Sequence, residues 1–211
     1  MSSSSQLTVV GLTGGIASGK STVARMLREF DLPVVDADAL GRMVLEPDGS
    51  AYERVLDEFG ASILSEDGRS IDRQKLGAEV FDDSERRAVL EGITHPEIAE
   101  LARRAFELVR ERGEPIAIYE AALIVETGLH RSLDALIVVA CSVAEQMERL
   151  GARDGISREA AAARIASQFP LDEKTTVADY VIDNSGDLTQ LRSRVGELAA
   201  ALEARFAPEV R

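Results

Sequence analysis

A glycine-rich turn between an apolar run and an amphipathic pattern constrains this chain more than any other feature. The turn is the octapeptide GGIASGKS at residues 14–21, and it matches the pattern G-x-x-x-x-G-K-[ST]. The apolar segment LTVVGL precedes it, and apolar residues follow it at helical spacing: Val23, Met26, Leu27 and Phe30. This succession of strand, glycine turn and helix is typical of a phosphate-binding loop.

The residue types of the turn suit the phosphates of a nucleoside triphosphate. Glycines let the backbone wrap closely around phosphate oxygens, and the following helix presents its positive N-terminus to the same anion. Lys20 is expected to bridge the β- and γ-phosphates, and the Ser21 hydroxyl to bind Mg²⁺. We predict ATP with Mg²⁺ as the ligand, and the predicted contacts are Gly14, Gly15, Ile16, Ala17, Ser18, Gly19, Lys20, Ser21 and Thr22.

Five apolar segments, separated by helical patterns, predict the fold class. The segments are LTVVGL, LPVVDAD, PIAIYE, LDALIVVA and ADYVIDN. Nearly continuous apolar strands are typical of a parallel sheet that is covered on both faces. The predicted fold is therefore α/β, with a doubly wound five-stranded parallel sheet.

Two helical excursions interrupt the predicted core. The first has short helical patterns and no clear strand, and its last helix is expected to have Pro96 in the first turn and to stop at Gly113. The second lies between the fourth and fifth strands, after a capping box of Ser142 with Glu145. The predicted division is a nucleotide-binding core of 1–38 and 99–211, a helical insertion of 39–98, and a small lid of 150–174.

Carboxylates follow two of the predicted strands, Asp36 and Asp38 after the second and Glu120 after the third. Ligands of open parallel sheets bind outside the carboxyl ends of the strands, so these groups are expected near the phosphate loop. Arg42 lies one helical turn beyond Asp38, and the two suit proton acceptance and the grip of an anionic acceptor. Glu120 could orient Mg²⁺ or its water. The alternatives are that Asp38 only caps a helix and that Glu120 holds no metal.

The predicted lid is rich in arginine, with Arg149, Arg153, Arg158 and Arg164. Phosphoryl-transfer enzymes use mobile cations that close over the transferring group. Arg149 and Arg153 are four residues apart and share a helix face. The alternative is that each arginine is solvated surface.

The composition limits which binding partners and which cellular compartment we expect. The net charge is −13, and this acidity argues against a nucleic-acid partner. No apolar run is long enough for a membrane span, and the first residues do not read as a secretory signal. The single Cys141 fits a reducing cytoplasm, and we expect it to be a buried thiol. Ser2–Ser5 are expected to be a frayed tail, and His95 and His130 lie in no metal-spaced cluster.

With these motifs in place, the chain resembles the dephospho-coenzyme A kinase family from about Leu7 to Gly186. The similar motifs occur in order: GLTGGIASGKSTV, VVDADALGRMV, IDRQKLGAEVF, ITHPEI, EAALIVETGL, RLGARDGIS, ARIASQF and ADYVIDNSG. The resemblance implies a P-loop kinase that uses ATP to phosphorylate the ribose 3′-hydroxyl of dephospho-coenzyme A. It implies that Asp38 is the catalytic base, with Lys20 and Arg149 also catalytic. The implied acceptor-binding residues are Asp38, Arg42, Arg73, His95 and Glu120, the metal-binding residues are Ser21 and Glu120, and the further ATP contacts are Arg149, Arg153, Asn184 and Gly186.

The chain departs from the family pattern at two positions. Ala17 stands where the family usually has glycine, and Ala122 stands where proline is usual. Two other functions remain open, namely another P-loop kinase, such as a nucleoside monophosphate kinase, and a nucleotide-dependent switch. The absence of an N-K-x-D pattern disfavours a guanine-specific switch. The expected partners are small-molecule substrates, with no membrane and no nucleic acid, and the protein is expected to be a monomer or a weak homo-oligomer.

Overall fold

The computed structural model of this chain describes residues 7–206. The chain forms two compact units, one of Met1–Val35 with Leu108–Arg211 and the other of Asp36–Glu107. We call them the sheet unit and the helical unit. The expected tail of Ser2–Ser5 lies outside the described residues, and the predicted domain and lid limits stay predictions.

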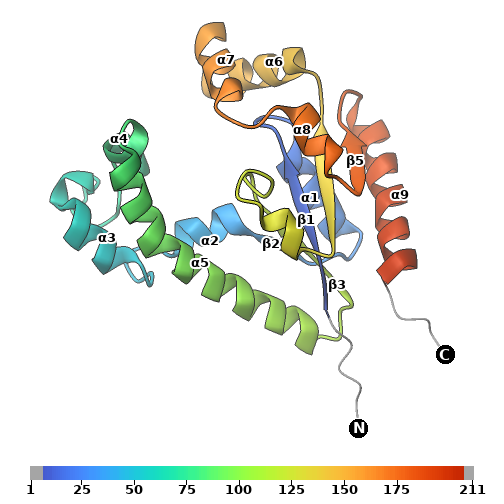
Figure 1. Ribbon diagram of the computed structural model, residues 1–211, viewed down its shortest axis with the longest axis horizontal. Helices are drawn as coiled ribbons and strands as arrows, with labels where there is room; N and C mark the ends of the chain where they lie inside the picture. The colour runs from blue at the N-terminus through green and yellow to red at the C-terminus, as the bar shows by residue number, and fades with distance from the viewer. Residues whose placement is uncertain (1–6, 207–211) are drawn as a thin grey trace. The chain divides into compact units, whose positions relative to one another are not determined.

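Five strands form one sheet, in the order β2-β3-β1-β4-β5 (Figure 1). Parallel pairing joins β1 to both β3 and β4, and β4 to β5. The strand bounds are β1 at Thr8–Gly14, β2 at Val34–Asp36, β3 at Ile116–Glu120, β4 at Ala135–Ala140 and β5 at Tyr180–Asp183. The predicted five-stranded parallel sheet is confirmed.

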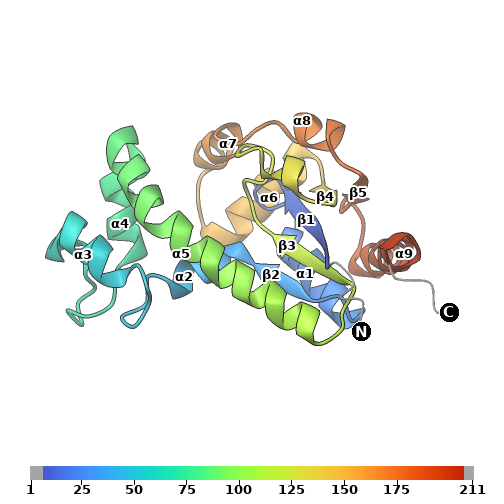
Figure 2. The same ribbon diagram turned by 60° about the horizontal axis from the view of Figure 1, so that its bottom comes forward.

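Strand β4, which lies between β1 and β5, shows how the sheet is buried on both faces. Ala135, Ile137 and Val139 point into one core, which α1 (Lys20–Glu29) and α9 (Leu188–Phe206) cover. Leu136 and Val138 point into a second core on the opposite face, with Ile124 and Leu171. Figure 2 shows α9 and α8 on different sides of the sheet. Alternate residues therefore enter different cores, which makes the fold doubly wound as predicted.

Helices also connect β4 to β5. They are α6 (Val143–Asp154), α7 (Arg158–Ala166) and α8 (Leu171–Thr176). The predicted capping box begins α6, because the Ser142 hydroxyl accepts the Glu145 N–H at 3.2 Å and the Glu145 carboxylate accepts the Ser142 N–H at 2.9 Å. A short 3₁₀ turn, η2 (Leu129–Ser132), precedes β4.

The helical unit has a core of its own. Its elements are α2 (Ala37–Met43), α3 (Tyr52–Phe59), η1 (Ala61–Ile63), α4 (Arg73–Phe81) and α5, which runs from Ser84 to Glu111 and so continues past the unit boundary. Val55 and Ile63 are fully buried in the core, and Leu90, Ile93 and Leu101 of α5 pack against it. The predicted helix at Tyr52–Phe59 is confirmed, and Gly60 follows it.

The expectation that Pro96 occupies a first helical turn is wrong. Pro96 lies inside α5, which begins twelve residues earlier at Ser84. Pro96 has no N–H for the Gly92 carbonyl, and an internal proline costs about 3 kcal/mol of helix stability. Apolar side chains on both sides of Pro96 pack on the same core: Leu90, Ile93, Ile98 and Leu101. These side chains are partly buried, and the apolar area that the four remove from water, at about 25 cal/mol per Å², offsets the loss.

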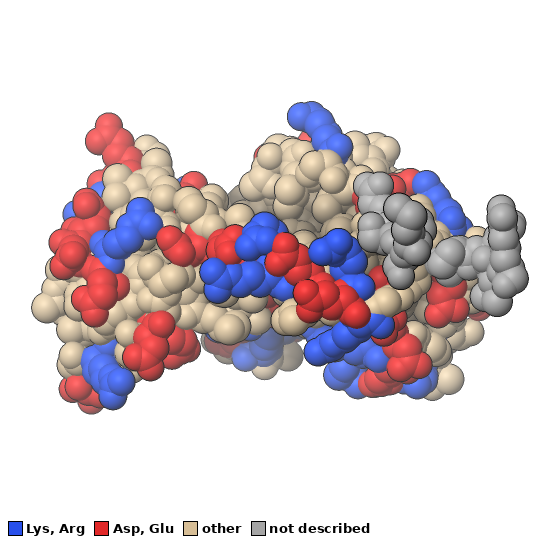
Figure 3. All heavy atoms as spheres, turned by 90° about the horizontal axis from the view of Figure 1, so that it is seen from below, with Lys and Arg blue, Asp and Glu red and all other residues tan. Residues whose placement is uncertain are grey.

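The surface shown in Figure 3 mixes the two signs of charge. Lysines and arginines alternate with aspartates and glutamates on this face and form no continuous basic stripe. Ion pairs of this kind occur along α5, where Arg103 is paired with Glu100 and Glu107. Every helix within residues 7–206 is too short or too polar to span a lipid bilayer.

Candidate nucleotide site

The glycine-rich turn connects β1 to α1 as the sequence predicts. Gly19 is the N-cap residue of α1, with a φ of 94°, and no side chain caps the helix there. The first N–H groups of a helix need acceptors, and the positive end of the helix favours an anion as that acceptor. The geometry of this helix start therefore suits a phosphate group.

Glycine is required in the turn because other groups pack closely against it. A Cβ atom added to Gly14 would lie 2.7 Å from the Val139 carbonyl oxygen. At Gly19 an added Cβ would lie 2.1 Å from the Asn184 side-chain nitrogen. The Ser18 hydroxyl is buried and has no hydrogen-bond partner among the described residues. A tightly held loop with an unsatisfied hydroxyl fits a polyanionic ligand.

Ala17 has the backbone conformation that usually requires glycine. Its φ is 58°, in the left-handed region, where an L-residue is strained by about 1–2 kcal/mol. The departure from the family pattern at this position therefore has a local cost, while the turn keeps its shape.

Lys20 and Glu120 meet at the carboxyl edge of two neighbouring strands. The Lys20 Nζ atom lies 2.8 Å from Glu120 Oε1, and their side chains are 12% and 3% exposed. The parallel register places Glu120 beside Leu12 of β1, only two residues before the turn begins. The sheet topology thus brings together two predicted site residues that are 100 positions apart in the sequence.

The metal-binding prediction rests on Ser21 and Glu120. Among residues 7–206, no cluster of three or more His, Cys, Asp and Glu could hold a metal ion. Magnesium is commonly bound by one or two protein oxygens together with substrate phosphates and water, and the oxygens of these two side chains suit it. The assignment of Ser21 and Glu120 to Mg²⁺ stays a prediction.

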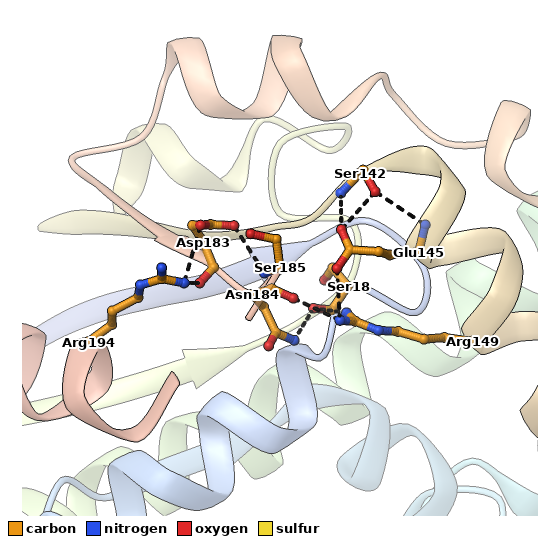
Figure 4. A network of polar contacts seen from close by, with 8 residues as sticks. All are labelled: Ser18, Ser142, Glu145, Arg149, Asp183, Asn184, Ser185 and Arg194. Atoms are coloured by element: carbon orange, nitrogen blue, oxygen red, sulfur yellow. Dashed lines mark hydrogen bonds and ion pairs between the residues drawn. The ribbon is translucent and has the colours of Figure 1, made fainter. Parts of the chain in front are cut away.

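Arg149 and Asn184 both contact the phosphate loop at Ser18, as Figure 4 shows. Asn184 Nδ2 donates to the Ser18 carbonyl oxygen at 2.7 Å, and Arg149 Nη1 donates to the same oxygen at 3.4 Å. Arg149 Nη2 donates to the Asn184 carbonyl oxygen at 2.8 Å and lies 3.4 Å from the Glu145 carboxylate. The two side chains expected to touch ATP are therefore joined to the loop that is expected to hold its phosphates.

The groups around Glu145 favour the ionised form of its carboxyl group. Hydrogen bonds from the Ser142 hydroxyl and N–H, together with the nearby Arg149 guanidinium, lower the pKa of Glu145. The carboxylate therefore stays charged and orients the Arg149 side chain. Burial raises the pKa of the Cys141 thiol just before α6, and the predicted buried cysteine is confirmed, at 8% exposure.

Two glutamines that the sequence analysis did not single out also bind the loop. Gln146 Nε2 donates to the Ile16 carbonyl oxygen at 2.7 Å, and Gln168 Oε1 accepts the Ile16 N–H at 2.7 Å. Gln146 is only 2% exposed. For Gln146, the sequence did hold a signal. Its amide lies on the buried face of an amphipathic helix, and a buried polar side chain needs a hydrogen-bond partner.

The other lid arginines do not contact the loop in the described contacts. Arg153 pairs with Asp154 at 2.7 Å and its side chain is 60% exposed, and Arg164 pairs with the same carboxylate at 2.7 Å. Arg158 is exposed at the start of α7. Gly186 is also exposed, two residues beyond Asn184. The ATP contacts of Arg153 and Gly186 stay predictions.

Asp38 and Arg42 lie in the helical unit, on α2. The helix begins at Ala37 and its N-cap is Asp36, whose carboxylate accepts the Ala39 N–H at 2.9 Å. The alternative that Asp38 caps this helix is therefore wrong, because Asp38 lies within the first turn. Arg42 lies 3.8 Å from Asp36. The expectation that Asp38 lies beside the phosphate loop stays a prediction.

Two further predicted acceptor residues, Arg73 and His95, are exposed on the helical unit. Arg73 is the first residue of α4, where Asp72 caps the helix by accepting the N–H groups of Gln74 and Lys75. His95 lies in the middle of α5. Both side chains are available to a ligand, and their contacts with the acceptor stay predictions.

The fold and the loop together define a class of protein. A parallel sheet, a G-x-x-x-x-G-K-[ST] turn after its central strand β1, and a lysine paired with a carboxylate on the adjacent strand are the features of a P-loop nucleotide-binding protein. A sequence profile described as "Dephospho-CoA kinase" matches residues 8–190. The chain belongs to the dephospho-CoA kinase family.

Individual relatives agree with the family assignment. The dephospho-CoA kinase of Syntrophotalea carbinolica is 45% identical over 200 residues, which cover 95% of this chain and 92% of the relative. The crystal structure of TT1252 from Thermus thermophilus is similar with a TM-score of 0.78 and 36% identity, covering 93% of this chain and 98% of that chain. A dephospho-CoA kinase structure from Campylobacter jejuni has a TM-score of 0.69 and 26% identity, with 95% and 99% covered.

Proposed function

We propose that this chain transfers the γ-phosphoryl group of ATP to the ribose 3′-hydroxyl of dephospho-coenzyme A, giving coenzyme A and ADP in the last step of coenzyme A synthesis. The observation that carries the proposal is the phosphate loop with its Lys20–Glu120 pair, in a chain that matches the family over residues 8–190. The protein acts on these two small molecules in the cytoplasm, as a monomer or a weak homo-oligomer.

The sheet unit binds the phosphates of ATP. The loop N–H groups and the N-terminus of α1 hold them. The Lys20 ammonium has three N–H donors, so it can donate to a phosphate oxygen while it keeps Glu120. Ser21 and Glu120 would hold Mg²⁺, which neutralises charge on the β- and γ-phosphate oxygens when it is bound.

The reacting hydroxyl needs a general base, and Asp38 is the residue proposed for that role. Asp38 accepts the proton of the 3′-hydroxyl, and the oxygen forms a bond to the γ-phosphorus as the bond to the β,γ-bridging oxygen breaks. Arg42, Arg73 and His95 bind the acceptor, while Arg149 and Arg153 stabilise negative charge on the transferring group. The transition state of such transfers is loose, so position and electrostatics supply most of the catalysis.

The acceptor is tested by ADP release in a coupled assay with dephospho-coenzyme A, AMP, CMP or no acceptor. The proposal predicts that, of these acceptors, only dephospho-coenzyme A supports the release of ADP. Turnover only with AMP or CMP would make the chain a nucleoside monophosphate kinase. ADP release that needs no acceptor would make it a nucleotide-dependent switch.

The role of Asp38 is tested by Asp38→Asn. Asparagine keeps the size of the side chain but cannot accept the proton, and a positioned base contributes about 10²–10⁴ in rate. We expect turnover to fall at least about 100-fold, with ATP affinity and melting temperature unchanged. Asp36→Asn is the matched control, because asparagine caps a helix about as well as aspartate. Equal turnover in the wild type and Asp38→Asn would contradict the assignment of the base.

A further inference from the structure

Two buried side-chain amides hold carbonyl groups of the phosphate loop. Gln146 of α6 donates from Nε2 to the Ile16 carbonyl oxygen, and Asn184 after β5 donates from Nδ2 to the Ser18 carbonyl oxygen, both at 2.7 Å. The two side chains are 2% and 8% exposed. Both donors approach within 2.4 Å of the position that a Cβ atom on Gly15 or Gly19 would occupy, so the contact is close.

Each amide is itself held in place. The Asn184 N–H donates to the Ala140 carbonyl oxygen of β4 at 2.7 Å, and the Asn184 carbonyl oxygen accepts from Arg149 at 2.8 Å (Figure 4). Gln146 lies in the first turn of α6, which the Ser142–Glu145 capping box fixes. The donors therefore belong to rigid parts of the sheet unit.

Holding a carbonyl group fixes the N–H group of the same peptide unit. The peptide is planar and trans, so its C=O and N–H bonds point in opposite directions. The Ile16 carbonyl shares its peptide with the Ala17 N–H, and the Ser18 carbonyl shares its peptide with the Gly19 N–H. When the carbonyls are bound to Gln146 and Asn184, these two N–H groups point away from the supporting side chains.

We propose that Gln146 and Asn184 are positioning residues that orient the Ala17 and Gly19 N–H groups toward the phosphates of the nucleotide. The loop contains flexible glycines and the strained Ala17, so its peptides can rotate unless they are held. The two amides favour one orientation before the nucleotide arrives, which removes part of the ordering cost of binding. The inference rests on the proposed nucleotide site. Asn184 is expected to contact ATP, and the inference adds that it sets the shape of the loop that holds the phosphates.

The test measures the binding of tripolyphosphate and of ATP, each with Mg²⁺, by calorimetry. Gln146→Met and Asn184→Leu keep the approximate side-chain size, add no charge and remove the donor. We expect affinity for both probes to fall by the same factor in each variant, about 3- to 10-fold, as the loss of one hydrogen bond implies. Gln74→Met, an exposed position on α4, is the control and should bind as the wild type does.

The probes separate the possible roles. If Asn184→Leu binds ATP more weakly but tripolyphosphate as tightly as the wild type does, Asn184 contacts the adenine of ATP and its positioning role is overturned. A lower melting temperature with unchanged affinity for both probes would make the amides purely structural. Gln146→Ala and Asn184→Ala extend the set, and failure of all four variants to fold would also overturn the proposal. A wild-type protein that binds neither probe would instead refute the nucleotide site itself.

Discussion

Replacing Lys174 tests a fully buried charge of the sheet unit. Lys174 lies on α8 with its side chain fully buried, and its Nζ atom lies 2.6 Å from Glu126 Oε1, whose side chain is 14% exposed. The same ammonium donates to the Ala122 carbonyl oxygen at 3.2 Å, which also accepts the Thr13 hydroxyl at 3.0 Å. The pair thus ties α8 to the segment that follows Glu120.

Lys174→Met keeps the length of the side chain and removes the charge. The Glu126 carboxylate would then lose its cation, and its Oε2 atom is already buried without a partner among the described residues. Removing one member of a buried ion pair costs about 3–5 kcal/mol. For a chain of this size each kcal/mol corresponds to about 2–4 °C, so the melting temperature should fall by about 6–20 °C.

Thermal and urea melting should be measured for Lys174→Met, Glu126→Gln and the double variant. The double variant should recover much of the loss, because a neutral pair leaves no buried charge uncompensated. Arg112→Met is the control, since Arg112 is an exposed cation of the sheet unit and its replacement should change stability little. A loss below about 1 kcal/mol in Lys174→Met, the size of an exposed pair, would refute the reasoning, as would a double variant no more stable than the single one.

Three other outcomes follow from the site. Ala17→Gly should raise the free energy of unfolding by about 0.5 kcal/mol in urea melts, because relief of the positive φ exceeds the entropy that glycine adds to the unfolded chain; a destabilised variant would count against strain. Lys20→Ala should lower turnover at least about 100-fold and also lower the melting temperature through Glu120, and Lys20→Ala/Glu120→Gln should restore melting but not turnover. Because burial raises the pKa of the Cys141 thiol, its reaction with Ellman's reagent at pH 8 should be slower in the native protein than in urea, and equal rates would contradict the burial.

The sequence predicted those parts of the fold that local patterns determine. The β1–loop–α1 unit has a short motif and two clear periodicities. All five strands are largely apolar runs, and β2, β3 and β5 end at a carboxylate. The capping box at Ser142 was equally local. In each case the residues that specify the structure are neighbours in the chain.

Tertiary packing decided what the local patterns did not. Pro96 favours a helix start, but apolar residues on both sides of it pack on one core and keep α5 continuous. Asp36 rather than Asp38 caps α2, because the strand ends at Asp36 and the helix follows at once. The contacts of Gln146 and Asn184 with the loop join residues at least 130 positions apart, and neither spacing nor periodicity carries such information.

The most direct test of the proposed reaction is the position of the new phosphate on the product. The purified chain is incubated with ATP, Mg²⁺ and dephospho-coenzyme A, and the product is examined by phosphorus–proton correlation NMR. The account predicts one new phosphate, coupled to the ribose 3′ proton, in amounts equal to the ADP formed. A phosphate coupled to any other position, or ADP formed without a phosphorylated acceptor, would contradict it.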